Sequence, residues 1–67
     1  MNKFAEKFKE LRLEKKLSQE DISAIFQCKQ SCISKWERGA TEPSFDELIK
    51  ISKFFKASTD YLLGEED

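Results

Sequence analysis

The fold of this chain is decided by residues 18–39, which read SQEDISAIFQCKQSCISKWERG. Ser18 stands three residues before an aspartate, a variant of the capping box that begins a helix. That helix should run to about Phe26, and the next should run from Gln30 to Glu37 and end at Gly39, since glycine readily takes a left-handed conformation. Two helices of about eight residues with a short turn between them have the dimensions of a helix-turn-helix.

Three more helices are predicted on either side of this segment. Strong helix formers fill residues 3–16, with apolar residues at helical spacing. The capping pattern recurs at 44–47 ahead of an apolar stretch, and a last short helix starts at Ser58 and stops at Gly64. The chain shows no sustained β-alternation, so the expected fold class is all-α, a compact five-helix bundle.

The helices are too short to be stable alone and must pack on a shared core. The candidate core residues are Phe4, Phe8, Leu11, Leu17, Ile22, Phe26, Cys28, Ile33, Trp36, Phe45, Leu48, Ile51, Phe54, Leu62 and Leu63. A length of 67 residues predicts a single domain over 1–67, with the helix-turn-helix at about 19–38 and an acidic tail at 65–67.

Composition argues against an enzyme. The chain contains no histidine, which removes the commonest general base and the commonest metal ligand. We therefore expect no catalytic residue, no metal site and no cofactor, and no small-molecule ligand is evident. Cys28 and Cys32 are expected to be reduced thiols with packing or surface roles; a redox switch is the alternative. The charged start and the short apolar runs predict a soluble, cytoplasmic protein without a membrane segment.

Charge is distributed unevenly along the chain. Residues 1–17 carry six basic and three acidic side chains, and residues 27–39 carry three basic and one acidic. Residues 40–67 carry seven acidic side chains against three lysines. If folding gathers the basic residues on one face, that face suits a phosphate backbone; ordinary solvation of helix surfaces explains the pattern equally well.

The helix predicted from Gln30 has two distinct faces. Ile33 and Trp36 are three residues apart and should point into the core. The opposite face carries short or medium hydrogen-bonding side chains: Gln30, Ser31, Ser34 and Lys35. Glutamine can pair with adenine, lysine can donate to guanine, and serine can serve either. These four are candidates to contact base edges in the major groove, although any exposed helix displays some such residues.

An ordered series of motifs resembles one known family. LSQ at 17–19, ISKWERG at 33–39, EPS at 42–44 and STDYLLG at 58–64 are similar to the helix-turn-helix domain of the XRE family, which contains the phage repressors and Cro. The resemblance covers roughly residues 3–64. It implies a lambda-repressor-like DNA-binding domain, encoded by a bacterium or a phage and associated with the nucleoid.

The resemblance also implies roles for single residues. Gln19 and Arg38 match positions that contact the DNA backbone, and Gln19 also braces the third helix. The four polar residues above match positions that face bases. Arg12 and Glu37 match a buried ion pair between the first and third helices; direct phosphate contact by Arg12 is the alternative.

Four positions depart from the family pattern, one of them Cys32, which replaces a typical serine or threonine on the third helix. Lys16 and Gln27 stand where glycine is common, so each turn is either strained or follows a different path. Lys29 replaces the usual serine or threonine cap of the third helix. A lysine cannot accept amide hydrogen bonds, but it can reach a phosphate at the helix N-terminus.

The sequence therefore predicts a transcriptional regulator that binds specific double-stranded DNA with its third helix in the major groove. One small module offers few contacts, so we expect a homodimer on a near-palindromic operator with half-sites about 34 Å apart. Tyr61, Leu62 and Leu63 are the expected dimer surface, with core packing as the alternative. Repression by occluding the polymerase is the simplest outcome, and activation stays open. The alternative function is a protein-interaction module that has kept this fold and lost DNA binding.

Overall fold

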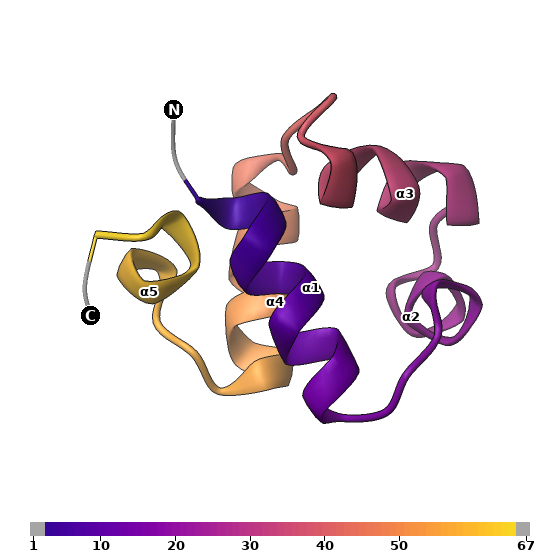
Figure 1. Ribbon diagram of the computed structural model, residues 1–67, viewed down its shortest axis with the longest axis horizontal. Coiled ribbons are helices and arrows are strands. Elements are labelled where there is room, and N and C mark those ends of the chain that lie inside the picture. Colours follow the sequence, from indigo (N-terminus) through magenta and orange to yellow (C-terminus); the bar gives the residue numbers. More distant parts are fainter. Residues whose placement is uncertain (1–2, 66–67) are drawn as a thin grey trace.

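The computed structural model describes residues 3–65, whose regular structure consists of helices (Figure 1). They are α1 (Phe4–Glu14), α2 (Gln19–Phe26), α3 (Gln30–Arg38), α4 (Phe45–Phe55) and α5 (Thr59–Leu63). No strand occurs between residues 3 and 65. The prediction of an all-α five-helix bundle is thus confirmed. The last two residues of the predicted acidic tail, 66–67, lie outside the described residues.

The helices form one cluster around α1. Helix α1 packs against α3 and α5, α2 packs against α3, and α4 packs against α5. Figure 1, in which the longest axis is horizontal, shows α2 and α3 toward one end of that axis and α5 at the other end. The radius of gyration is 10.7 Å, close to the value of about 11 Å expected for a compact domain of this length.

Local capping explains where α2 and α4 begin. The Ser18 hydroxyl accepts the N–H of Asp21 at 3.0 Å, and the Asp21 carboxylate accepts the N–H of Ser18 at 2.9 Å. Ser44 and Glu47 form the same reciprocal pair at the start of α4. Helix α3 has no side-chain cap, because Lys29 occupies its N-cap position.

The core is largely aromatic. The Trp36 ring of α3 makes edge contacts with Phe4 and Phe8 of α1, at centroid distances of 6.3 and 5.7 Å. Phe8 also meets Phe55 of α4 edge-on at 6.0 Å. Such T-shaped pairs are worth about 0.5–1.5 kcal/mol beyond the area they bury. The fully buried aliphatic residues Ile22, Ile33, Ile51 and Leu62 complete the core.

Two core assignments from the sequence need correction. Phe45 was expected inside, but 87% of its surface is exposed. It stands at the first position of α4, six residues before Ile51, and therefore points about a third of a turn away from that buried residue. Phe55, absent from the predicted core, is only 8% exposed and contacts Phe8.

The turns keep the expected path and carry strain. Lys16 and Gln27 adopt left-handed conformations, with φ of 58° and 55°. Helix α1 therefore ends at Glu14, before the residue 16 suggested by composition. Gly39 has a φ of 75° and ends α3, as predicted. A non-glycine residue in this region costs about 1–2 kcal/mol. Of the two alternatives, a strained turn or a different path, the structure therefore shows strained turns at Lys16 and Gln27.

We predict that Lys16→Gly and Gln27→Gly each stabilise the protein. Each removes the left-handed strain, and the entropy lost by glycine on folding offsets part of the gain, leaving about 0.5–1 kcal/mol. Urea denaturation measures the free energy of unfolding. Ala24→Gly, in the exposed middle of α2, is the matched control and should destabilise by about 1 kcal/mol. Equal losses at all three positions would contradict the prediction.

The capping carboxylate of Asp21 predicts a pH dependence. The N–H and hydroxyl of Ser18 lower the pKa of Asp21 from its usual value of 3.8. A carboxylate with a lowered folded-state pKa stabilises the protein above its unfolded-state pKa, and this effect is lost as the pH falls through the folded value. Wild type should be more stable than Asp21→Asn at pH 6, and the difference should shrink below pH 4.

Thermal denaturation across this pH range measures the difference. Glu20→Gln is the control, because it removes a carboxylate from the same first turn but no bond to Ser18. If the Glu20 and Asp21 variants follow the same pH profile, the cap is not the source of the effect.

Candidate nucleic-acid interface

Helix α3 is anchored by one face and exposed on the other. Ile33 and Trp36 are 0% and 2% exposed and hold the helix against the core. On the opposite side Gln30, Ser31 and Lys35 are exposed, and Ser34 is half-buried. The polar face that the sequence assigned to base contacts is therefore not covered by the rest of the described chain.

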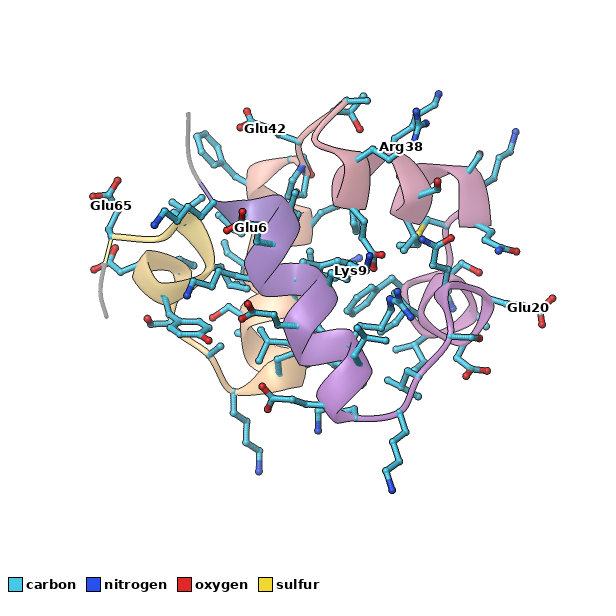
Figure 2. All side chains as sticks on the ribbon, in the orientation of Figure 1. Glu6, Lys9, Glu20, Arg38, Glu42 and Glu65 are labelled. Carbon is cyan, nitrogen blue, oxygen red and sulfur yellow. The ribbon has the colours of Figure 1, made fainter. Side chains whose placement is uncertain are left out.

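The exposed charged side chains of α3 and its N-cap are all basic, because the one acidic residue of α3 points inward. Lys29, Lys35 and Arg38 are exposed, and Figure 2 shows Arg38 projecting away from the body of the molecule. Glu37 is the only acidic residue between residues 27 and 39. Its side chain is only 5% exposed and pairs with Arg12. The exposed side of α3 thus carries positive charge without a neighbouring carboxylate of its own helix.

A shallow hollow lies beside the first turns of α3. Its lining residues are Cys28, Lys29, Ser31, Cys32, Lys35 and Thr41. The structure therefore brings three of the predicted DNA contacts together on one concave surface. The sequence did not predict that Thr41 lines this hollow, because its position depends on how the loop after α3 folds back. The N–H groups of Ala40 and Thr41 both bond to the carbonyl of Lys35.

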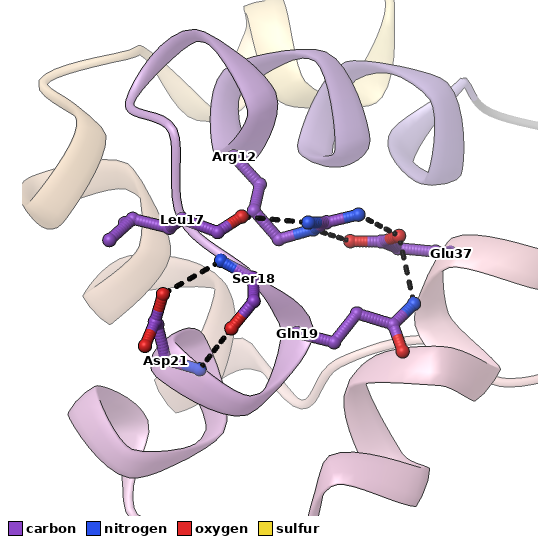
Figure 3. A network of polar contacts seen from close by, with 6 residues as sticks. All are labelled: Arg12, Leu17, Ser18, Gln19, Asp21 and Glu37. Atoms are coloured by element: carbon purple, nitrogen blue, oxygen red, sulfur yellow. Dashed lines mark hydrogen bonds and ion pairs between the residues drawn. The ribbon is translucent and has the colours of Figure 1, made fainter.

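A buried polar network fixes the position of α3 relative to α1 (Figure 3). Arg12 donates from Nε to Oε2 of Glu37 at 2.6 Å and from Nη2 to Oε1 at 3.0 Å. Its Nη1 donates to the carbonyl of Leu17 at 2.7 Å. The guanidinium is thus used within the molecule, which assigns Arg12 to structure and not to a phosphate.

Gln19 joins this network from the first residue of α2. Its Nε2 donates to Oε1 of Glu37 at 3.2 Å, so α1, α2 and α3 meet at one carboxylate. This bond between α2 and α3 agrees with the bracing role that the family resemblance implied for Gln19. Hydrogen bonding to Glu37 also raises the pKa of Arg12, against the opposing effect of burial. Arg12 therefore stays charged at any pH at which the protein is folded.

The two cysteines belong to the packing beneath this surface. Both are half-buried free thiols in contact with the hydrophobic core. Burial raises the pKa of the Cys28 thiol, and the adjacent Cys32 raises it further. Because the thiolate is the reactive form of cysteine, a protonated Cys28 favours the packing role over the redox alternative.

The predicted dimer surface on α5 needs correction at one residue. Leu62 is fully buried in the core of the monomer, so it cannot contact a second molecule. Tyr61 and Leu63 are half-buried. Tyr61 also lies under the ammonium group of Lys7, which is 4.8 Å from the ring centroid.

A short helix such as α2, followed after a tight turn by a second helix such as α3 that is packed on one face and exposes polar and basic side chains on the other, defines the helix-turn-helix class of DNA-binding domains. A family model described as helix-turn-helix (HTH_3) matches residues 8–62. The chain therefore belongs to this family, the XRE-type helix-turn-helix proteins, as the sequence motifs predicted. The family is one of transcriptional regulators and not of enzymes.

Among its relatives, the chain is 41% identical over 64 residues to the HTH-type transcriptional activator BcrR of Enterococcus faecalis. It is 34% identical over 58 residues to repressor protein C2 of Salmonella phage P22. These alignments cover 96% and 87% of this chain but 31% and 27% of the relatives. The chain thus spans about a third or less of the length of these two proteins.

Solved structures show the same fold. A transcriptional regulator from Listeria innocua matches with a TM-score of 0.91 and 25% identity, over 100% of this chain and 63% of that one. The P22 c2 repressor in complex with a synthetic operator matches with a TM-score of 0.85 and 32% identity, over 94% of this chain and 96% of that one. Among residues 3–65, no helix has the length and apolar character needed to cross a membrane.

The buried pair makes a sharp stability prediction. Arg12→Met leaves the Glu37 carboxylate buried without its partner, which should cost about 3–5 kcal/mol. The double variant Arg12→Met/Glu37→Met removes both charges and should recover a large part of that loss. Urea denaturation of the two single variants and the double variant measures the coupling. A double variant whose loss equals the sum of the single losses would show that the two residues do not interact.

Proposed function

We propose that this chain represses transcription by binding a near-palindromic DNA operator as a homodimer, with α3 of each copy in the major groove. The observation that carries the proposal is the two-sided character of α3. One face is fixed by Ile33, Trp36 and Glu37, while the other presents unobstructed polar side chains. A rigidly held helix with exposed hydrogen-bonding groups is what direct base reading requires.

Sequence reading falls to Gln30, Ser31, Ser34 and Lys35. Gln30 lies in the first turn of α3, the part of a recognition helix that reaches deepest into the groove. An amide can form two bonds to adenine, and an ammonium group can donate to guanine. Ser34 is half-buried, so its reach is shorter than that of its neighbours.

Phosphate binding falls to residues at the edges of this surface. Lys29 and Arg38 flank the two ends of α3 and are exposed. The first amides of α3 have no side-chain cap, which leaves the helix N-terminus suited to an anion. Gln19 is half-buried and bonded to Glu37; it contacts the backbone with the polar atoms that this bond leaves available.

The proposal of a dimer rests on the small size of the domain, and the proposal of repression rests on the simplest effect of a protein bound at a promoter. A module of this size supplies too few contacts for tight, selective binding, whereas two copies double them. Tyr61 and Leu63 of α5 are the candidate contacts between copies. Repression follows from occupying a promoter and excluding the polymerase. The relatives include both a repressor and an activator, so the sign of regulation is tested separately, by transcription from a promoter that carries the site.

Selection of bound sequences from a random duplex library tests the proposal directly. The expected result is a consensus with two inverted half-sites whose centres are about one helical turn apart, or about 34 Å. Affinity for the selected duplex should then fall with salt at a log–log slope near −6, as for about 6–8 neutralised phosphates. If no sequence is enriched and binding is absent at low salt, the protein-interaction module is the better interpretation.

Two substitutions on α3 should separate base reading from phosphate binding. Lys35→Ala should alter the selected consensus and cost about 1–3 kcal/mol on the preferred site. Arg38→Ala should weaken all duplexes by a similar factor and make the salt slope shallower by about one. Titration against matched and mismatched duplexes measures both effects. Lys53→Ala is the control, because Lys53 is exposed in the last turn of α4 and is not part of α3. The DNA affinity of this variant should equal that of wild type.

A further inference from the structure

Two cysteines lie next to each other at the start of α3, and neither is among the proposed DNA contacts. Cys28 stands two residues before the helix, and Cys32 lies in its first turn. Both are free, half-buried thiols that line the same shallow hollow. They also interact: burial raises the pKa of the Cys28 thiol most, and Cys32 raises it further through its charge and a hydrogen bond. Two thiols that reach each other and open onto one surface can act together as ligands.

We propose that Cys28 and Cys32 bind one copper(I) ion per chain, and that the bound ion weakens DNA binding. The metal site depends on the two thiols alone, whereas its effect on DNA rests on the proposed function. The expectation of no metal site came from the missing histidine, which excludes a four-ligand zinc site within the chain. That reasoning does not apply to a metal that needs only two sulfur ligands.

The number of donors selects copper(I) among the metals that thiolates bind. Thiolates favour copper(I), zinc and iron–sulfur clusters. Structural zinc takes four protein ligands, and iron–sulfur clusters take four as well. Among residues 3–65, no group of three or more histidine, cysteine, aspartate or glutamate side chains is placed to hold a metal. Copper(I) is a soft ion that two sulfur ligands satisfy, so it is the metal that this pair fits.

Backbone hydrogen bonds hold both cysteines in place before a metal binds. The N–H of Cys28 bonds to the carbonyl of Ser23 at 3.0 Å, just after the end of α2. The N–H of Cys32 bonds to the carbonyl of Lys29 at 2.9 Å, in the first turn of α3. Because both ligands belong to hydrogen-bonded turns, metal binding does not have to order a loop, and this pre-organisation favours affinity.

The charges around the pair favour a copper complex. Both thiols release their protons to water when they bind a metal, so two thiolates and one monovalent ion carry one net negative charge. Lys29 and Lys35 line the same hollow, and the N-terminus of α3, which has no side-chain cap, also attracts negative charge. The carboxylate of Glu47 is the opposing group, since it also acts on Cys28. Two ammonium groups and a helix N-terminus oppose this one carboxylate.

The negative charge of the complex explains the effect on DNA. Lys29 and the first amides of α3 are the groups proposed to hold a DNA phosphate. A negatively charged complex beside them occupies the same positive charge and repels that phosphate. The copper-loaded protein should therefore bind DNA about tenfold more weakly, the usual cost of losing one charge-assisted contact. The site makes DNA binding responsive to copper(I).

Titration of the full chain with copper(I), without oxygen and in competition with a coloured copper(I) chelator, tests the metal site. Wild type should bind one ion per chain, and X-ray absorption should show two sulfur ligands. Cys28→Ser and Cys32→Ser each leave one thiol and should bind about 10²–10⁴-fold more weakly, because chelation is lost. Thr41→Ala is the matched control: Thr41 lines the hollow without supplying sulfur, so this variant should bind copper(I) as wild type does. Thermal unfolding without metal checks that each variant is folded.

The DNA affinity of the metal-free and the copper-loaded protein is then measured on the selected duplex. Copper(I) should weaken binding by wild type about tenfold and leave binding by Cys28→Ser unchanged at the same concentration. The inference is overturned if both serine variants bind copper(I) as tightly as wild type, or if one ion bridges two chains. It is also overturned if copper(I) leaves the DNA affinity of wild type unchanged. If wild type binds copper(I) through both sulfurs but the metal-free protein binds no DNA, the metal site stands and the proposed function fails.

Discussion

The bidentate bond between Arg12 and Glu37 sets the geometry of this domain. Both side chains are nearly removed from water, and such charges are tolerated only when their partners are in place. Arg12 meets this condition with bonds to Glu37 and to the carbonyl of Leu17. Any rotation of α3 that separates the pair would leave a buried charge unsatisfied. The orientation of α3 is thus determined by a steep energetic penalty as well as by apolar packing.

The same bond shapes the electrostatics of the exposed surface. Glu37 lies next to Arg38 and near Lys35 in the sequence. If its side chain were exposed to solvent, its negative charge would offset the positive charges of these two residues. Pairing with Arg12 turns it to the inner side of α3, while the basic residues stay exposed. Gln19 reaches the same carboxylate from α2. One network therefore holds three helices together and leaves a positive, hydrogen-bonding face, so folding and the proposed DNA reading depend on one set of contacts.

Much of this was predictable from local patterns. Serine caps with a carboxylate three residues later mark the starts of α2 and α4, and Gly39 marks the end of α3. These signals act within one turn of chain, so they are readable without a fold. The helix-turn-helix, the inward Ile33 and Trp36, and the outward polar residues of α3 follow from helical spacing in the same way. The pairing of Arg12 with Glu37 came from family resemblance, because nothing local links residues 25 positions apart.

Residue spacing by itself determined the helices and which side of each one is apolar. Only the tertiary structure decided where an apolar stripe stops being covered. Phe45 was misassigned for this reason, since 87% of its surface is exposed, and for Leu62 the structure decided between the two predicted roles, because it is fully buried in the core and not on a dimer surface. Periodicity defines a direction around a helix axis, whereas burial depends on which other elements reach that point along it, and those elements come from distant parts of the chain.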